Sequence, residues 1–219
     1  MKYNITFIIP CGRIPFANAG QKTVDSILKN HPDAEIIVSS KEKIHYKDII
    51  SIQERSDNIG CVKPCNIMAL MARGDYICML NDDYYLNDNS INPAIDYLLK
   101  HHLMGLTLFP CDGIGTGVGR CPFYDNKKGS WLDTVMFPVV KKEFIASYGE
   151  LMFFRLKHYY GDNTISIRLW KDFNQTKFVF DNNSLYVCSS QHTKYSLFKE
   201  QPNEFETYKK FLRFYNVTE

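Results

Sequence analysis

The stretch Tyr76-Ile-Cys-Met-Leu-Asn-Asp-Asp83 joins a run of apolar residues to two adjacent carboxylates. The run Tyr76–Leu80 is typical of a buried strand, and it stops where the acids begin. In open α/β sheets ligands bind at the carboxyl ends of the strands, so Asp82 and Asp83 stand where a ligand is expected. Mg²⁺ and Mn²⁺ prefer oxygen ligands, usually one or two carboxylates together with phosphates of a substrate. The stretch therefore favours a site for a metal-bridged diphosphate, with a solvated Asp/Asn turn as the alternative.

Around this stretch, predicted strands alternate with predicted helices. The strands are expected at Ile5–Ile9, Glu35–Val38, Ile49–Gln53, Tyr76–Leu80 and Leu106–Phe109. The helices are expected at Thr23–Asn30, Lys63–Arg73 and Asn92–His101. This alternation predicts an α/β fold with a mainly parallel central sheet flanked by helices.

The second half of the sequence has a different character. Four glycines between Gly113 and Gly119 predict a mobile loop over Pro110–Ser130. Beyond it we expect strands at Thr134–Val140, Phe178–Phe180 and Leu185–Val187, and helices at Lys142–Tyr148, Asn163–Lys171 and Glu204–Tyr215. We interpret the chain as one continuous domain, with an α/β half over residues 1–109 and a second half over residues 110–219.

Composition excludes several classes of protein. The chain has 219 residues, of which 45% are hydrophobic and 23% charged, so it is globular rather than disordered. Its net charge of only +2 gives no basic stripe for nucleic acid. The seven cysteines are odd in number and form no C-x-x-C pair, which favours free thiols and a cytoplasmic location. No apolar run approaches the roughly 18 residues that a membrane span needs.

Further motifs surround the acidic stretch. Asp57-Asn-Ile-Gly60, Asn66 and Ala72-Arg-Gly-Asp-Tyr76 precede it, and Tyr160-Gly-Asp-Asn-Thr-Ile-Ser-Ile-Arg168 follows it. Together with Leu80-Asn-Asp-Asp83 they resemble the GT-A-fold, family 2-type nucleotide-sugar glycosyltransferases over roughly residues 3–170. In that family a D-x-D or D-D element ends a strand, and a later (G/E)-D-x-x-x-x-x-R element supplies the catalytic base.

The resemblance implies an inverting, divalent-metal-dependent glycosyltransferase. A sugar would pass from a nucleoside-diphosphate sugar, with UDP-sugar as the first expectation, to a hydroxyl of a glycan or glycoconjugate acceptor. Asp162 would be the catalytic base, and Asp83 would bind Mn²⁺ or Mg²⁺, with His192 carried over as a further metal ligand. Residues expected at the donor are Pro10, Gly12, Arg13, Ser39, Ser40, Asn58, Lys63, Asn81 and Asp82. Trp131 and Asp133 are expected at the acceptor.

Two departures from the family pattern keep other functions open. The second predicted strand leads into Ser39-Ser40, where the family commonly has an acid that reads the nucleoside, and Asn81 replaces the first acid of D-x-D. A catalytically degenerate module that binds glycan or nucleotide is therefore an alternative. A nucleotidyltransferase is a weaker one, because Cys11-Gly12-Arg13 is a poor match to the Gly-rich basic loop that such enzymes need.

Several of these residues also have plain structural interpretations. Asp162 could cap the following helix, His192 could be an ordinary histidine, and Trp131 could be a core residue. The aromatic helix Glu204–Tyr215 is expected to pack on the sheet, with docking on a membrane surface or on a further domain as alternatives.

Overall fold

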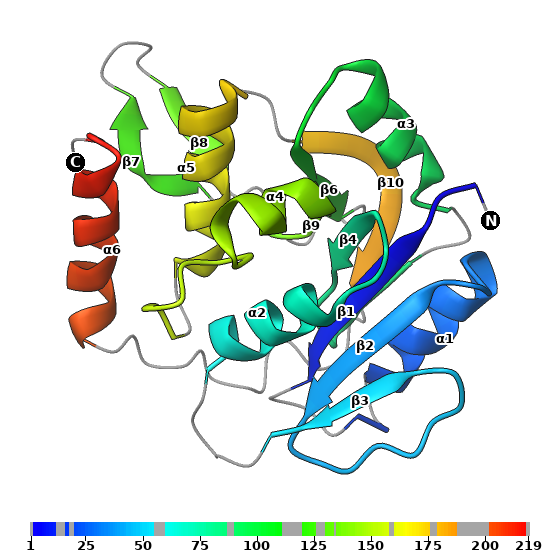
Figure 1. The fold of residues 1–219 in the computed structure, drawn as a ribbon. Coiled ribbons are helices and arrows are strands. Elements are labelled where there is room, and N and C mark those ends of the chain that lie inside the picture. The colour runs from blue at the N-terminus through cyan, green and yellow to red at the C-terminus, as the bar shows by residue number, and fades with distance from the viewer. Residues whose placement is uncertain are drawn as a thin grey trace.

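The apolar run that opens the acidic stretch is a strand near the middle of an eight-stranded sheet (Figure 1). In the computed structural model of the chain this run is β4 (Tyr76–Met79). The structure describes residues 2–11, 16–17, 20–54, 60–86, 90–110, 120–125, 130–133, 135–157, 160–175, 179–187 and 202–217.

The other strands of this sheet are β1 (Ile5–Cys11), β2 (Glu35–Ser40), β3 (Ile50–Gln53), β5 (Tyr84–Leu86), β6 (Gly105–Pro110), β9 (Pro138–Lys141) and β10 (Val179–Val187). Their order is β3-β2-β1-β4-β9-β6-β10-β5. Only β9 and β5 run against the direction of the other six strands. The mainly parallel sheet is therefore confirmed.

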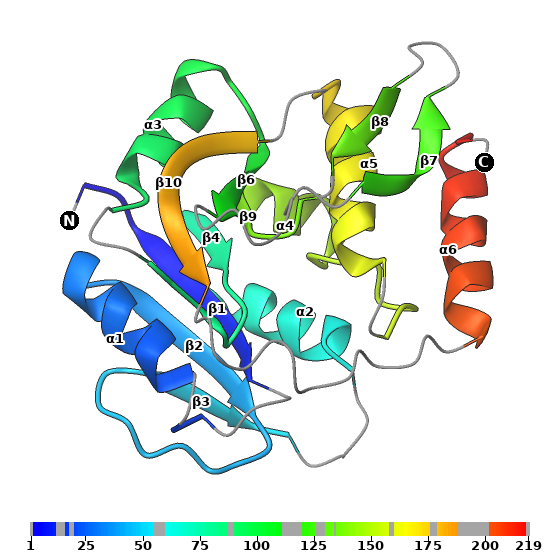
Figure 2. The ribbon, with the colours of Figure 1, turned by 180° about the vertical axis from the view of Figure 1, so that it is seen from behind.

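Helices cover both faces of the sheet, as Figures 1 and 2 show from opposite sides. Side chains of α1 (Gly20–Asn30) and α3 (Asn92–Lys100) share one apolar cluster with the sheet. Those of α2 (Val62–Met71), α4 (Lys142–Tyr148), α5 (Gly161–Phe173) and α6 (Pro202–Phe214) share a second cluster. The two clusters lie on opposite faces because successive strand residues point to opposite sides.

Strand β1 illustrates why the central strands are apolar along their whole length. Ile5, Phe7 and Ile9 belong to the cluster with α1 and α3, whereas Ile8 belongs to the cluster with α2 and α5. All four side chains are buried. A strand that is covered on both faces reads as a continuous apolar run, which is the pattern that predicted it.

Most predicted elements of the first half are confirmed, with shifts of a few residues at their ends. Helix α1 is the largest shift, because it begins at Gly20 rather than at Thr23. Short strand β5 was not predicted. It pairs antiparallel with β10, so its formation depends on a strand about a hundred residues further along the chain.

The second half differs more from the predictions. The expected mobile loop over Pro110–Ser130 is wrong for residues 120–125, which form β7 (Arg120–Asp125) and pair antiparallel with β8 (Ser130–Asp133). The glycines of Gly113–Gly119 lie outside the described residues. The expected strand Thr134–Val140 begins only at Pro138, and the two strands expected between residues 178 and 187 are one strand, β10, with a shift in its pairing.

The C-terminal helix was expected to pack on the sheet, but its described contacts are with α5 and the segment before α5. Tyr208, Phe211 and Leu212 are buried in the cluster around α5, whereas Phe214 is 79% exposed. No helix among the described residues combines the length and the apolarity that a membrane crossing requires. The described cysteines Cys11, Cys61, Cys65 and Cys78 carry free thiols.

Candidate active site

The carboxyl ends of four parallel strands bring five of the predicted donor residues to one edge of the sheet: Pro10, Ser39, Ser40, Asn81 and Asp82. Pro10 is in register with Ser39, and Cys11 with Ser40. The next strand places Ser40 opposite Gln53. On the other side of β1, the amide of Leu80 donates to the carbonyl of Ile8 at 3.1 Å, so the acidic stretch leaves the sheet at the same edge.

The acidic stretch after β4 forms a tight turn that α1 supports. The Tyr84 amide donates to the Asn81 carbonyl at 3.2 Å. The hydroxyl of Thr23, in the first turn of α1, donates to the carbonyls of Tyr84 at 2.6 Å and Asp82 at 3.3 Å. Asp82 is 6% exposed, whereas Asp83 is only partly buried. Of the two carboxylates, Asp83 is the more accessible to a ligand.

Negative charge gathers around the end of β1. The pKa of the Cys11 thiol is raised well above its usual value, first by burial and then by the charges of Asp82, Glu54 and Asp83. The described residues contain no group of three or more His, Cys, Asp and Glu side chains that could hold a metal ion by themselves. A divalent cation that arrives with a diphosphate needs only one or two carboxylates from the protein. The oxygen donors of Asp82 and Asp83 fit that requirement.

Glu54 is a residue that the sequence analysis missed. It follows β3 directly, its amide donates to the Ser40 carbonyl at 2.8 Å, and its Oε1 accepts a hydrogen bond from the Ser39 hydroxyl at 2.7 Å. An acid therefore does lie at the end of the second strand, but the neighbouring strand supplies it. An acid immediately after the third predicted strand was the signal in the sequence that could have revealed it.

Two helices begin beside these strand ends. Gly20 opens α1 against the end of β1, and a methyl group added there would lie 2.7 Å from Cys11 Sγ. Lys63 lies in the first turn of α2 and is exposed, in agreement with its predicted position near a helix start. The amino ends of helices carry partial positive charge and favour anions such as phosphate.

Asp162 lies in the first turn of α5, but it is not the N-cap. The helix begins at Gly161 and its N-cap is Tyr160, so the interpretation of Asp162 as the cap is wrong. Its Oδ1 still accepts a hydrogen bond from the Asn163 amide at 2.9 Å. Burial raises the pKa of Asp162 to about 6, against the lowering effect of the hydrogen bonds from the amides of Asn163 and of Asp162 itself. A carboxylate with this pKa is suited to accept a proton near neutral pH.

The segment before β9 connects Asp162 to the acidic stretch. The Val135 amide donates to the Ser166 hydroxyl at 3.0 Å, and that hydroxyl lies 3.4 Å from the Asp162 carbonyl, to which it donates. Two residues beyond Val135, the Phe137 ring contacts the Tyr84 ring, with centroids 4.4 Å apart. The segment is thus linked to the main chain of Asp162 on one side and to Tyr84, the residue after Asp83, on the other.

The hairpin of β7 and β8 leads into this segment. Trp131 and Asp133 belong to β8, and the pairing places Asp133 opposite Arg120 and Trp131 opposite Tyr124. Strand β7 lies against α5, as Figures 1 and 2 also show. The acceptor role of Trp131 and Asp133 stays a prediction. Four other predicted site residues lie outside the described residues: Gly12, Arg13, Asn58 and His192.

Comparison with solved structures identifies the architecture. The structure of residues 1–349 of S. aureus TarS superimposes with a TM-score of 0.69 at 15% identity, covering 99% of this chain and 66% of that one. The same fragment in complex with UDP-GlcNAc gives a TM-score of 0.70 at 13% identity, covering 99% of this chain and 68% of that one. The mannosyltransferase PcManGT from Pyrobaculum calidifontis, in complex with GDP-Man and Mn²⁺, gives 0.63 at 10% identity, covering 88% of this chain and 59% of that one.

This chain has the GT-A-type glycosyltransferase fold. No protein-family model matches the chain, and neither does any curated protein. The chain spans 66% of the length of the TarS fragment and covers 37% of the longer TarS structure. The acidic stretch lies at the end of a central strand, as the resemblance to GT-A enzymes implied.

Proposed function

We propose that this GT-A protein is an inverting glycosyltransferase that takes its sugar from a nucleoside-diphosphate donor. A UDP-sugar is the first candidate donor, and the acceptor is a hydroxyl group on a glycan or glycoconjugate. The observation that carries the proposal is the Asp82–Asp83 pair at the end of a central parallel strand in a GT-A fold, with Asp162 in the first turn of α5 as the candidate base. The GT-A structures named above, in complex with UDP-GlcNAc and with GDP-Man and Mn²⁺, support the choice of donor class.

In this proposal the acidic stretch binds the diphosphate end of the donor. Asp83, the more accessible carboxylate, would hold Mn²⁺ or Mg²⁺, and the buried Asp82 would support it or contact the ribose. When bound, the cation stabilises the negative charge that develops on the leaving diphosphate. Lys63, at the start of α2, would add positive charge on the phosphate side.

Glu54 and Ser39 would contact the nucleoside. An ionised carboxylate only accepts hydrogen bonds and repels phosphate, so Glu54 suits groups that donate, such as ribose hydroxyls or the N–H of a base. Its hydrogen bond from Ser39 fixes one of its two oxygens. This contact would replace the acid that the second strand lacks.

Asp162 would act as the base on the acceptor side. Its carboxylate takes the proton from the acceptor hydroxyl while that oxygen forms a bond to the anomeric carbon and the bond to the diphosphate oxygen breaks. One base on the face opposite the leaving group gives a single displacement with inversion. Because the pKa of Asp162 is about 6, we expect kcat/KM to fall as the pH drops below 6 and the carboxylate becomes protonated.

A binding experiment tests the donor site first. Thermal unfolding would be followed with UDP-, GDP- and dTDP-sugars, each with and without Mn²⁺, for the wild type and for Asp83→Ala. A ligand at about 100 times its Kd adds roughly 2.7 kcal/mol to the free energy of unfolding, which raises Tm by several degrees. We expect a Mn²⁺-dependent rise for one nucleotide class, and we expect Asp83→Ala to lose it. The absence of a shift with every nucleotide would contradict the proposed donor site.

The variant Asp162→Asn tests the chemistry separately from binding. It keeps the shape of the side chain and removes the base, so we expect transfer, or donor hydrolysis measured as release of nucleotide, to fall by at least about a hundredfold. The Mn²⁺-dependent thermal shift should remain. A wild type that binds nucleotide but shows no turnover, with Asp162→Asn indistinguishable from it, would instead favour a degenerate binding module.

A further inference from the structure

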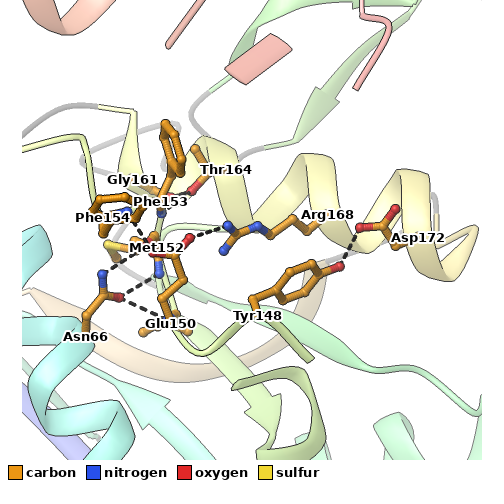
Figure 3. A network of polar contacts seen from close by, with 11 residues as sticks. Asn66, Tyr148, Glu150, Met152, Phe153, Phe154, Gly161, Thr164, Arg168 and Asp172 are labelled. Atoms are coloured by element: carbon orange, nitrogen blue, oxygen red, sulfur yellow. Dashed lines mark hydrogen bonds and ion pairs between the residues drawn. The ribbon is translucent and has the colours of Figure 1, made fainter. Parts of the chain in front are cut away.

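Asn66 lies on α2 and points at the segment that leads to α5 (Figure 3). Its side chain is buried, at 8% exposure, and makes three hydrogen bonds to main-chain groups of that segment. Oδ1 accepts from the amides of Leu151 at 3.0 Å and Met152 at 2.8 Å, and Nδ2 donates to the Met152 carbonyl at 2.8 Å. One side chain thus satisfies both main-chain groups of Met152.

Met152 in turn touches the first residue of α5. A methyl group added to Gly161 would lie 2.7 Å from Met152 Sδ and 3.1 Å from Val62 Cγ2. Gly161 is therefore enclosed between α2 and the segment that Asn66 holds. Asp162 is the next residue along the chain, so its backbone position depends on this contact.

Further contacts join the same segment to α5 beyond Gly161. The Phe153 amide donates to the Thr164 hydroxyl at 3.2 Å, and that hydroxyl donates to the Gly161 carbonyl at 2.5 Å. Glu150 forms a buried ion pair with Arg168, and its other oxygen accepts from the Phe154 amide at 2.8 Å (Figure 3).

The start of α2 and the last helix hold the far end of the segment. The Val62 amide donates to the Lys157 carbonyl at 3.2 Å, and the Lys157 amide donates to Glu204 of α6 at 2.8 Å. Among the described residues, the charged side chains at this junction include Lys157, Glu204 and the Glu150–Arg168 pair. Hydrogen bonds therefore join the segment to α2, α5 and α6. Asn66 is the α2 side chain that binds the middle of the segment.

We propose that Asn66 is a positioning residue, which fixes the start of α5 through Met152 and Gly161 and thereby fixes the main chain from which Asp162 projects. The inference rests on the proposed function only in giving Asp162 its role as base. The hydrogen bonds of Asn66 and the contact between Met152 and Gly161 stand whatever reaction Asp162 serves.

The ionisation of Asp162 makes the effect of Asp162→Asn on stability depend on pH. A general loss of stability does not change that pH dependence. Burial raises its pKa to about 6, so the folded protein is destabilised when this carboxylate ionises. Asp162→Asn removes that cost, and its stabilising effect should be larger at pH 8 than at pH 4. For a pKa of 6 against an ordinary 3.8, the difference in the unfolding equilibrium constant is on the order of fifty-fold.

The experiment repeats this measurement after Asn66 is replaced. Urea unfolding at pH 4 and pH 8 would compare Asn66→Ala with Asn66→Ala/Asp162→Asn. Asp162 is only partly buried in the wild type. Without the Asn66 hydrogen bonds to Met152 we expect its carboxylate to become more hydrated and its pKa to fall towards its ordinary value, so that the fifty-fold difference shrinks to about fivefold or less. If Asn66→Ala does not fold, Asn66→Ser is the milder variant, because the serine hydroxyl can still form a hydrogen bond with one main-chain group of the segment.

Gln175, at the other end of α5, offers a matched control. Its Oε1 accepts from the amides of Met104 at 3.1 Å and Gly105 at 3.4 Å, and its Nε2 donates to the Gly105 carbonyl. Gln175→Ala therefore removes side-chain hydrogen bonds of the same kind, but far from Asp162. We expect the effect of Asp162→Asn on the unfolding equilibrium, measured in this background, to keep its full dependence on pH. A difference that survives equally in the Asn66 and Gln175 variants would overturn the proposal.

Turnover separates this inference from the proposed function. With UDP-GlcNAc and Mn²⁺, donor hydrolysis by Asn66→Ala at pH 8 should show a kcat at least tenfold below that of Gln175→Ala, with a similar KM. If Asp162→Asn retained wild-type hydrolysis, Asp162 would not be the base, yet the pH-dependent unfolding would still report whether Asn66 positions it. An unchanged kcat in Asn66→Ala, alongside an inactive Asp162→Asn, would contradict the positioning role alone.

Discussion

Asp162, the proposed base, lies where burial disfavours its charged form, so its ionisation costs stability. It lies in the first turn of α5, where helix amides favour a negative charge, yet burial outweighs them and raises its pKa to about 6. A carboxylate with an ordinary pKa would be a weaker base towards a hydroxyl group. The residue therefore gains basicity from the same burial that disfavours its charged form.

Glu54 gives the first prediction at the residue scale. Glu54→Gln keeps the size of the side chain but removes its charge, so a donating group of the nucleoside would lose a charge-assisted hydrogen bond. We expect the Kd of the nucleotide sugar to rise about tenfold, which corresponds to about 1.4 kcal/mol, with little change in kcat. Titration calorimetry of UDP-GlcNAc with Mn²⁺ would measure it.

Glu42→Gln is the control for that prediction. Glu42 is exposed and lies two residues beyond Ser40, so its replacement changes the net charge equally without touching the Ser39–Glu54 hydrogen bond. Equal affinities for Glu54→Gln and Glu42→Gln would show that Glu54 does not contact the nucleoside.

The hydrogen bond between Ser39 and Glu54 also shows which contacts of single residues a sequence cannot predict. Asp82 and Asp83 could be predicted, because they directly follow a recognisable strand. The partnership of Ser39 and Glu54 could not, because it depends on the register between β2 and β3, which no local pattern of the sequence specifies.

At the scale of the element, the junction between the segment before α5 and α2 depends on a glycine. Gly60 has a φ of +73°, and a methyl group added there would lie 2.0 Å from the Lys157 carbonyl oxygen. We expect Gly60→Ala to lower the free energy of unfolding by about 2–4 kcal/mol, because backbone strain and a clash act together. Urea unfolding measures this loss.

Gly149 separates the two causes. It has a similar φ of +68° at the end of α4, but nothing lies within 4 Å of an added methyl group. Gly149→Ala should therefore show the strain alone, about 1 kcal/mol. If both variants lowered the free energy of unfolding by the same amount, the close contact between Gly60 and the Lys157 carbonyl would contribute nothing to stability.

Elements were predictable where local pattern and tertiary environment agree. Strands β1, β2 and β4 are covered on both faces, so their apolar runs identify them. Strand β7 was missed because the nearby glycines suggested a loop, whereas residues 120–125 are ordered as a strand by pairing with β8. Strand β5 has only three residues and exists through its pairing with β10.

At the scale of the whole molecule, His31 makes the stability depend on pH. It is 1% exposed, and its Nε2 accepts a hydrogen bond from the Ile91 amide at 3.1 Å, which joins the end of α1 to the start of α3. Burial lowers the pKa of His31 from 6.5 to about 4. As the pH falls from 6.5 to 4, His31 becomes protonated in the unfolded chain but stays largely neutral in the folded protein. The folded state therefore loses stability over this range.

His31→Gln should remove the contribution of His31 to the pH dependence of the free energy of unfolding. Between pH 7 and pH 4 we expect the wild type to lose on the order of 2–3 kcal/mol more than the variant does. Asp162 acts in the opposite sense over part of this range but is present in both proteins, so it cancels. Exposed His45→Gln is the control, and a wild-type pH dependence in His31→Gln would contradict the assignment.

The position of β9 has a consequence for how the chain folds. This antiparallel strand lies between β4 and β6, so the block β3-β2-β1-β4 joins the rest of the sheet only through residues 138–141. Within the block, β1 pairs with β2 and β2 with β3 across about thirty residues or fewer. Both pairings of β4, with β1 and with β9, span about sixty to seventy residues. We therefore expect a folding nucleus within β1, β2 and β3. Replacing Ile8 by Val should slow refolding, and replacing Val139 by Ala should mainly speed unfolding.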